Sequence, residues 1–168
     1  MVTATFYNDS KLENNNNESQ QDASLTVAQS LSHILADTYL LYLKTQNYHW
    51  NVKGNMFYGI HNLLEEQYQE LAIAVDDIAE RIRVLGLSAP GSFKQFLELS
   101  SLEEASGIPN AEEMVQQLVN DHETLAGKLS GVLQQAEKVN EISSSELLGG
   151  RIRTHEKQAW MLKSMLSQ

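Results

Sequence analysis

Two pairs of metal-type side chains lie on residues 55–86, a stretch whose apolar periodicity predicts one long helix. His61 and Glu65 form the first pair, and Asp76 and Glu80 form the second. Each pair has the i, i+4 spacing that places two side chains on the same side of a helix. At about 100° per residue, all four fall within a stripe roughly 100° wide. Imidazole and carboxylate groups arranged in this way are typical ligands of iron, manganese or zinc.

The two pairs cannot share an ion within one chain. Fifteen residues separate His61 from Asp76, which corresponds to roughly 22 Å along a helix. An antiparallel copy, related by a two-fold axis near Glu70 and Leu71, would bring the first pair of one chain against the second pair of the other. Isologous dimers, the commonest oligomers, make contacts of this kind. The spacing therefore suggests two equivalent metal sites at a homodimer interface.

A further candidate ligand, His49, lies one short loop before this helix, at the end of a first helix. Taken alone, pairs of histidine and acid are common on solvated helix faces, and a histidine at a helix C-terminus can bind the last carbonyl groups. The shared stripe favours metal binding, because solvent exposure gives no reason for the alignment. Trp50 is the aromatic residue expected nearest to the metals. We interpret His33, His122 and His155 as surface or packing histidines.

The residue types exclude several other metal sites. None of the five histidines has a glutamate three residues before it. Di-iron bundles that hold both metals inside one chain use Glu-x-x-His on facing helices, so a centre of that kind is not expected. The chain has no cysteine, which excludes disulfides, thiolate sites and cysteine nucleophiles. Any metal must be held by His, Asp and Glu, and oxygen-rich ligation favours iron or manganese.

The composition is that of an acidic protein of one domain. It has 168 residues and a formal net charge of −10 at pH 7. This charge repels nucleic acid and anionic membranes and attracts cations. The sequence has no apolar run of about 18 residues, and its first ten residues, MVTATFYNDS, lack the pattern of a signal peptide. We therefore expect a cytoplasmic protein without a membrane partner.

Helical periodicity predicts four long helices with one long connection in the middle. The polar residues 1–23 are expected to form a mobile tail, and residues 24–168 the folded domain. Pro90 and Pro109 bracket the long connection, which contains a short predicted helix. The expected helices cover residues 24–51, 55–86, 92–99, 110 onward and 143–166. This order predicts an all-α four-helix bundle with a crossover.

Three segments resemble the Dps family of mini-ferritins. The first is HWNVKG at 49–54, followed by Phe57, His61 and Glu65. The second is DDIAERI at 76–82, and the third is HEKQAWML at 155–162. The likeness covers the chain from about Ser24 to its end. The combined motif is long, oddly spaced and free of gaps, which makes it specific.

The resemblance implies a ferritin-like four-helix bundle, assembled as a hollow homododecamer with ferroxidase sites between two-fold-related chains. By the family pattern one chain supplies three ligands and its partner two, and a tryptophan lies close to the centre. Family members oxidise Fe(II), preferentially with hydrogen peroxide, and store Fe(III), which protects the cell and its DNA. Zinc or manganese can compete for such ligands. The corresponding residues are His49, His61 and Glu65 of one chain, Asp76 and Glu80 of the other, and Trp50; the position of Glu65 is often Asp in the family.

The resemblance also bears on iron entry and on DNA. Ferritin-like shells have acidic three-fold pores, for which Glu146 is the first candidate and Glu141 the second, with surface solvation as the alternative for Glu141. Many Dps proteins bind DNA through lysine-rich tails, whereas the tail of this chain has one lysine, Lys11, against four acidic residues. We therefore predict weak or absent DNA binding. The alternatives are a nucleoid-associated DNA-compacting protein with a secondary metal site, and a purely structural bundle.

Overall fold

The computed structural model describes residues 6–166, which contain five helices and the loops between them. Their bounds are α1 Phe6–Asn51, α2 Phe57–Val84, α3 Phe93–Leu99, α4 Ala111–Lys138 and α5 Ile142–Leu166. The four long helices and the short one in the crossover are those that the periodicity predicted. No helix among these residues is both long and apolar enough to cross a membrane.

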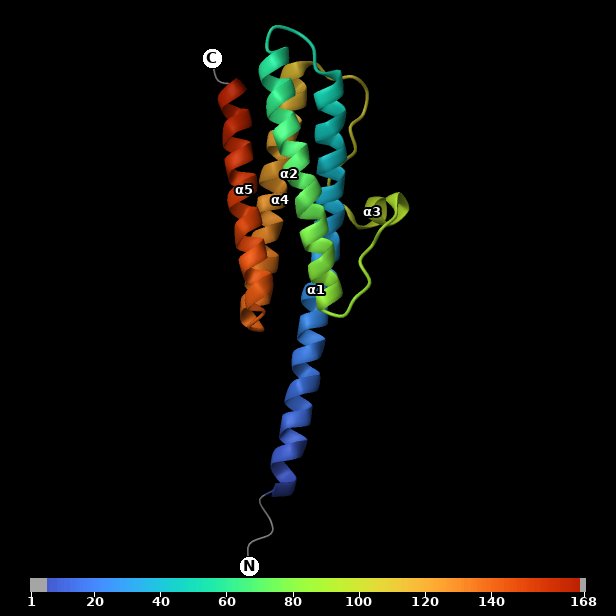
Figure 1. Ribbon diagram of the computed structural model, residues 1–168, viewed down its shortest axis with the longest axis vertical. Coiled ribbons are helices and arrows are strands. Elements are labelled where there is room, and N and C mark those ends of the chain that lie inside the picture. Colours follow the sequence, from blue (N-terminus) through green and yellow to red (C-terminus); the bar gives the residue numbers. More distant parts are fainter. Residues whose placement is uncertain (1–5, 167–168) are drawn as a thin grey trace, which may run out of the picture.

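The long helices pack as two antiparallel pairs (Figure 1). One pair is α1 with α2, and the other is α4 with α5. Helices α2 and α4 run in the same direction, because the long crossover returns the chain to the end at which α2 began. The short α3 lies outside the bundle, against α1. The residues on α1 and α2 that carry the metal-type side chains therefore lie on adjacent, antiparallel helices.

The helix ends follow from local sequence. Gly54 and Gly86 have positive φ angles of 106° and 97°, conformations that glycine adopts without strain. Asn110 caps α4, because its side chain accepts the Glu113 N–H while the Glu113 carboxylate accepts the Asn110 N–H. Ser92 caps α3 by accepting the Gln95 N–H. These signals place α2, α3 and α4 close to their predicted bounds.

The first helix differs from the prediction. It begins at Phe6 instead of near Ser24, so most of the segment expected to precede the bundle is helical backbone. The sequence before Gly54 contains neither glycine nor proline, so nothing in it interrupts a helix that propagates toward the N-terminus. The expected mobility of residues 1–23 stays a prediction, and residues 1–5 lie outside the described part of the chain.

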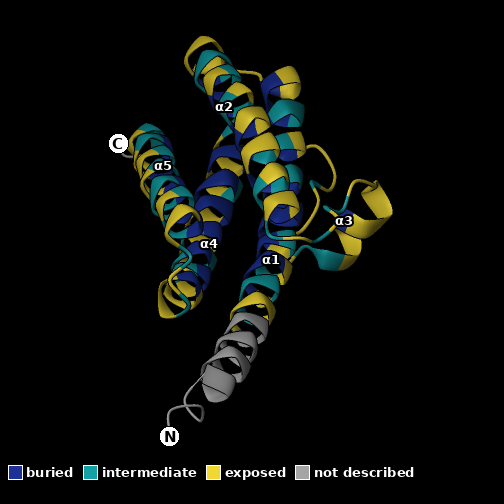
Figure 2. Ribbon diagram, turned by 60° about the horizontal axis from the view of Figure 1, so that its bottom comes forward, coloured by how far each residue is buried: buried dark blue, intermediate teal, exposed yellow. Residues whose placement is uncertain are grey.

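A continuous apolar core fills the centre of the bundle, where the buried faces of the long helices meet (Figure 2). Its largest fully buried side chains include Tyr48, Leu31, Ile60, Leu118 and Leu125. Burial of each such aliphatic side chain contributes roughly 1.5–3 kcal/mol. The core holds α1 and α2 in a fixed register, which is the relationship that builds the candidate site.

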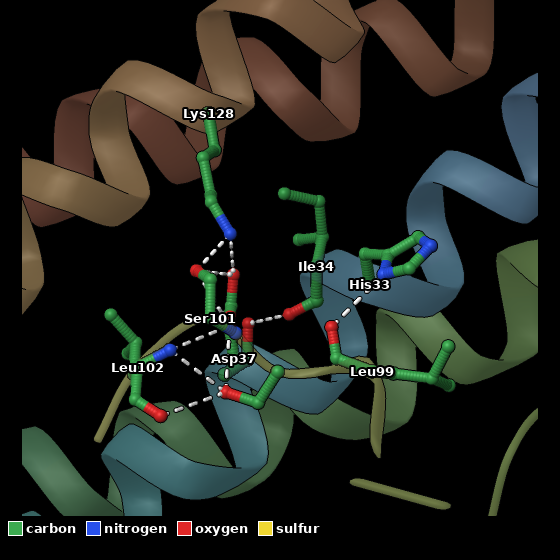
Figure 3. Close-up of polar contacts among 9 residues, drawn as sticks. His33, Ile34, Asp37, Leu99, Ser101, Leu102 and Lys128 are labelled. Atoms are coloured by element: carbon green, nitrogen blue, oxygen red, sulfur yellow. Dashed lines mark hydrogen bonds and ion pairs between the residues drawn. The ribbon is translucent and has the colours of Figure 1, made fainter. Parts of the chain in front are cut away.

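A buried carboxylate fastens the crossover to this core (Figure 3). Asp37 on α1 has no exposed surface and accepts the Ser101 and Leu102 N–H groups and the Ser100 hydroxyl. The Lys128 ammonium of α4 lies 2.8 Å from the same carboxylate. Burial by itself raises the pKa of Asp37, but Lys128 and the hydrogen bonds from Ser101 and Ser100 bring the pKa below its ordinary value. The charged carboxylate thus ties α1, α4 and the crossover together.

Candidate metal centre

His49 and His61 form the centre of the candidate site. His49 lies in the last turn of α1, and His61 lies in the second turn of α2, on the far side of the short loop. Their imidazole rings stack with centroids 3.8 Å apart and planes 18° from parallel. The side chain of His49 is buried and that of His61 is half-buried. The loop between α1 and α2 thus brings two imidazoles from different helices into direct contact.

Each ring is oriented by the backbone of the other residue. Nδ1 of His49 lies 2.8 Å from the His61 carbonyl oxygen, and Nδ1 of His61 lies 2.9 Å from the His49 carbonyl oxygen. A carbonyl oxygen only accepts, so both Nδ1 atoms must carry the proton and donate. In the neutral imidazole, Nε2 then keeps its lone pair. Second-sphere hydrogen bonds of this kind are what prepare a histidine for metal binding.

Other aromatic rings extend the stack. Phe57 stacks on His61 at 5.0 Å between centroids, and Tyr68 of α2 meets His49 edge-on at 5.1 Å. The imidazole pair is therefore held between two rings as well as by two hydrogen bonds. This packing limits the rotation of both imidazoles.

The three carboxylates lie along the outer face of α2. Glu65 is half-buried one turn beyond His61, and its only recorded polar partner among the described side chains is Gln69, at 3.5 Å. Asp76 and Glu80 are exposed, and no hydrogen bond or ion pair within the described residues engages either one. Three potential ligands thus lie on one helix, and two of them, Asp76 and Glu80, have no partner among the described residues.

The predicted ligands do not meet within one chain. Among the described side chains, no three histidine, aspartate or glutamate residues gather into a group that one ion could join. The structure brings together His49 and His61, with Glu65 one turn away, and leaves Asp76 and Glu80 on the distant half of α2. This agrees with the spacing argument that one helix cannot bring both pairs to one ion.

Trp50 and the two pore candidates have different surroundings. Trp50 follows His49 directly and has 62% of its surface exposed. Glu146 is exposed and borders a surface hollow of about 560 Å³ between the ends of α4 and α5, next to Arg153. Glu141 is engaged: one carboxylate oxygen lies 2.5 Å from an Arg81 nitrogen, and the other accepts the Ser24 hydroxyl. Glu146 is the freer of the two acids, and the role of both in iron entry stays a prediction.

One buried series of polar side chains was not predicted from the sequence. His122 of α4 and His155 of α5 are buried, with their Nδ1 atoms 2.8 Å apart. Arg151, which also pairs with Glu70, donates to His155 Nε2 at 3.2 Å. His155 must therefore carry its proton on Nδ1 and donate to His122, whose proton then lies on Nε2, an atom without a partner among the described residues. These are packing histidines, as one of the two interpretations held.

Burial keeps both members of this histidine pair neutral. Desolvation, together with the charge of Arg151, lowers the pKa of His122 to about 3. Desolvation and the neighbouring His122 and Arg151 lower the pKa of His155 well below its ordinary value. Two sequence signals could have located the pair. Arg151 and His155 have i, i+4 spacing, and Leu118, Val119 and Leu125 lie three or four positions from His122, on its face of α4.

Comparisons with known proteins agree with this architecture. The family model of the ferritin-like domain matches residues 28–168. The chain is 37% identical over 142 residues to DNA protection during starvation protein 2 of Bacillus anthracis, which covers 84% of this chain and 97% of that protein. It is 42% identical over 138 residues to an uncharacterised low temperature-induced protein of Nostoc sp., over 81% and 77% of the two chains.

Solved structures show the same fold. A Dps protein from Bacillus brevis superposes with a TM-score of 0.84 at 34% identity, over 87% of this chain and 98% of that one. A Dps protein from Vibrio cholerae O1, described as a member of a broad superfamily of ferritin-like diiron-carboxylate proteins, gives a TM-score of 0.84 at 30% identity, over 88% and 92%. The predicted ferritin-like bundle is confirmed, and the chain belongs to the Dps family of ferritin-like proteins.

Proposed function

We propose that this protein is a ferroxidase that oxidises Fe(II) with hydrogen peroxide at sites shared between two chains, and that it stores the Fe(III) formed. The observation that supports the proposal most directly is the reciprocal orientation of His49 and His61, which leaves both Nε2 atoms available. Two such nitrogens beside an acidic helix face are suited to a divalent transition metal. Iron is the substrate that also fits the family.

Two-fold symmetry would complete each site. An axis that passes α2 midway between Glu70 and Leu71 pairs His61 of one chain with Glu80 of the other, and Glu65 with Asp76, because both pairs share that midpoint. The face of α2 that carries Asp76 and Glu80 can contact a second chain, since both side chains are exposed and unpaired among the described residues. Ile73, on the same face, has 65% of its surface exposed, which is typical of a residue that a partner covers.

The ligand set favours the oxidation. Hard, anionic carboxylates stabilise Fe(III) more than Fe(II), while the imidazoles retain affinity for incoming Fe(II). Two Fe(II) ions supply two electrons to one hydrogen peroxide, which takes up two protons and leaves as two waters. No hydroxyl radical forms in this stoichiometry. The cell and its DNA would be protected in this way, and zinc or manganese would compete for the same ligands.

The proposed assembly is a hollow dodecamer in the cytoplasm. Twelve chains of 18.9 kDa give a particle of about 227 kDa, a mass that is easily distinguished from a dimer. Glu146 is proposed to line the iron entry pores, since it is exposed near the end of the bundle.

Co-assembly of two inactive variants tests whether the site is shared. His49→Ala and Asp76→Ala should each lose Fe(II) oxidation when assembled alone. In a mixed dimer, one of the two sites combines both defects and the other has neither, so random mixing restores about a quarter of the sites. A site made by one chain would regain no activity in any mixture. The matched control mixes His49→Ala with His61→Ala. Both ligands belong to the same half-site, so every site in the mixture still lacks one histidine and no activity should return.

A further inference from the structure

We propose that Tyr68, Tyr42 and Tyr39 form a relay that supplies an electron to the metal centre when only one Fe(II) is bound. The inference rests on the proposed ferroxidase function, because that function supplies Fe(II) and peroxide. The relay would keep peroxide from being cleaved by one electron. It would then move the resulting tyrosyl radical away from His49 and His61.

The relay consists of rings in a continuous series of edge contacts. Tyr68 lies 5.1 Å from His49 between centroids. Tyr42 of α1 lies 6.3 Å from Tyr68, and Tyr39, one turn before it on α1, lies 5.8 Å from Tyr42. All contacts have the edge-on geometry of interacting aromatic pairs. The series leads from the metal-type imidazoles along the α1–α2 pair toward α3.

At the far end of the series, the rings that follow Tyr39 are phenylalanines. Tyr39 stacks on Phe96 at 4.5 Å and meets Phe93 edge-on at 6.1 Å. Phenylalanine is much harder to oxidise than tyrosine because it has no hydroxyl group, so an oxidising equivalent that reaches Tyr39 stops there. At the other end, Phe57 closes the stack beyond His61 in the same way. Within this series of ring contacts, which does not include Trp50, phenylalanine therefore lies at both ends.

Packing alone does not require three hydroxyl groups in this series. All three tyrosines are half-buried, and Tyr39 and Tyr42 pack against the apolar core, where phenylalanine would fill nearly the same volume. The only recorded side-chain partner of a hydroxyl group among the three is Gln46, at 3.5 Å from the Tyr42 oxygen. The hydroxyl groups thus add little to the hydrogen bonding of the fold, yet they make each ring oxidisable.

In the first step, peroxide receives one electron from Fe(II) and one from Tyr68. One Fe(II) gives one electron and becomes Fe(III), and the Tyr68 phenol gives one electron and its hydroxyl proton and becomes a neutral tyrosyl radical. Hydrogen peroxide takes both electrons, the phenolic proton and one proton from solvent, and leaves as two waters. The O–O bond breaks without release of a hydroxyl radical.

The following steps move the radical outward. Tyr42 gives an electron and a proton to the Tyr68 radical, and Tyr39 then does the same for Tyr42. Each phenol is partly exposed, so water can take and return the proton. At Tyr39, a small one-electron reductant in solution, of the ascorbate or thiol class, donates an electron, a proton is taken up, and the phenol is restored.

The test uses the assembled protein with less than one Fe(II) per site. Peroxide is added, samples are frozen within milliseconds, and the tyrosyl radical is measured by electron paramagnetic resonance, with ascorbate present or absent. We expect a tyrosyl signal in the wild type that ascorbate removes quickly. Tyr42→Phe should leave the radical on Tyr68 and slow its removal by ascorbate by about tenfold, because the step past position 42 then has a higher barrier.

The matched control is Tyr58→Phe, the same chemical change on α2 at a residue that is 77% exposed and outside the series. It should behave as the wild type. Circular dichroism and assembly mass verify that both variants fold and assemble. If Fe(II) is oxidised at the normal rate but no tyrosyl signal forms, or if Tyr42→Phe and Tyr58→Phe decay alike, the relay is rejected. If the wild type does not oxidise Fe(II) at all, the ferroxidase proposal is the one that fails.

Discussion

The imidazoles of His49 and His61 stack at 3.8 Å, and each donates Nδ1–H to the backbone carbonyl oxygen of the other residue. The end of α1 and the beginning of α2 are thus joined by two side chain–backbone hydrogen bonds across the short loop. Both free nitrogens are Nε2 atoms, and their direction is set before any metal arrives. A preorganised pair of this kind lowers the cost of binding.

Replacement of His61 by phenylalanine should abolish iron oxidation while preserving the ring stack. The variant loses one Nε2 and also the hydrogen bond that orients the loop, so we expect the oxidation rate to fall by at least roughly 100-fold. Stopped-flow absorbance of Fe(III) formation measures the rate. Phe57→Leu is the control, since it removes a neighbouring ring and no nitrogen. A His61→Phe rate within a few-fold of the wild type would reject the assignment of this ligand.

The buried histidine pair makes stability depend on pH. The pKa of His122 in the folded protein, about 3, lies below the unfolded value of about 6.5. The unfolded chain therefore binds more protons below pH 6.5, and the free energy of unfolding decreases as the pH falls from about 6.5 toward 3. His155 shifts in the same direction. Between pH 7 and pH 5 we expect His122 to cost about 2 kcal/mol of unfolding free energy, and His155 adds to this loss.

Chemical unfolding of the assembled protein at a fixed chain concentration measures this loss. The double variant His122→Leu with His155→Leu should be nearly insensitive to pH over that window. His33→Leu, at an exposed histidine, should keep the dependence of the wild type. Equal unfolding free energies of the wild type at pH 7 and pH 5 would contradict the prediction.

The Asp37 carboxylate should be a main anchor of the crossover. Asp37→Asn keeps the size of the side chain but removes its negative charge. The carboxylate pairs with Lys128 and accepts hydrogen bonds from two backbone N–H groups. We expect a loss of roughly 2–3 kcal/mol in unfolding free energy and faster hydrogen exchange at Ser101 and Leu102.

The control for this anchor is Glu98→Gln. It breaks an exposed ion pair with Lys94, whose atoms are 3.9 Å apart, and should change stability by less than about 0.5 kcal/mol. The anchor hypothesis would be wrong if the two variants lost equal stability and exchange at the crossover stayed slow.

DNA binding should be weak or absent at physiological salt. The net charge of −10 repels phosphate, and the first 23 residues contain one lysine against four acidic residues. A gel-shift assay with duplex DNA should show no complex, whereas the variant Glu13→Lys with Glu18→Lys should produce binding that weakens as salt is added. Saturation of the duplex by the wild type at low micromolar protein would favour a DNA-compacting role instead.

Most of the helices and the ligand spacing could be predicted from local sequence patterns. Apolar periodicity, the Asn110 cap and the two prolines place α2 to α5 correctly, because these signals act within a few residues of the chain. The i, i+4 pairs on α2 are equally local, so the separation of His61 from Asp76 follows from helical rise alone. The start of α1 was missed, since an uninterrupted polar segment contains no stop signal.

The contacts between side chains of different helices could not be predicted in this way, because they depend on how the helices pack. The stack of His49 on His61, the buried pair of His122 with His155 and the tyrosine series depend on the register and rotation of packed helices. That register is set by many core contacts acting together, so no local pattern in the chain specifies it. The residue types thus indicate that the site can bind a metal. The packing of α1 against α2 determines which imidazole nitrogens are free to do so.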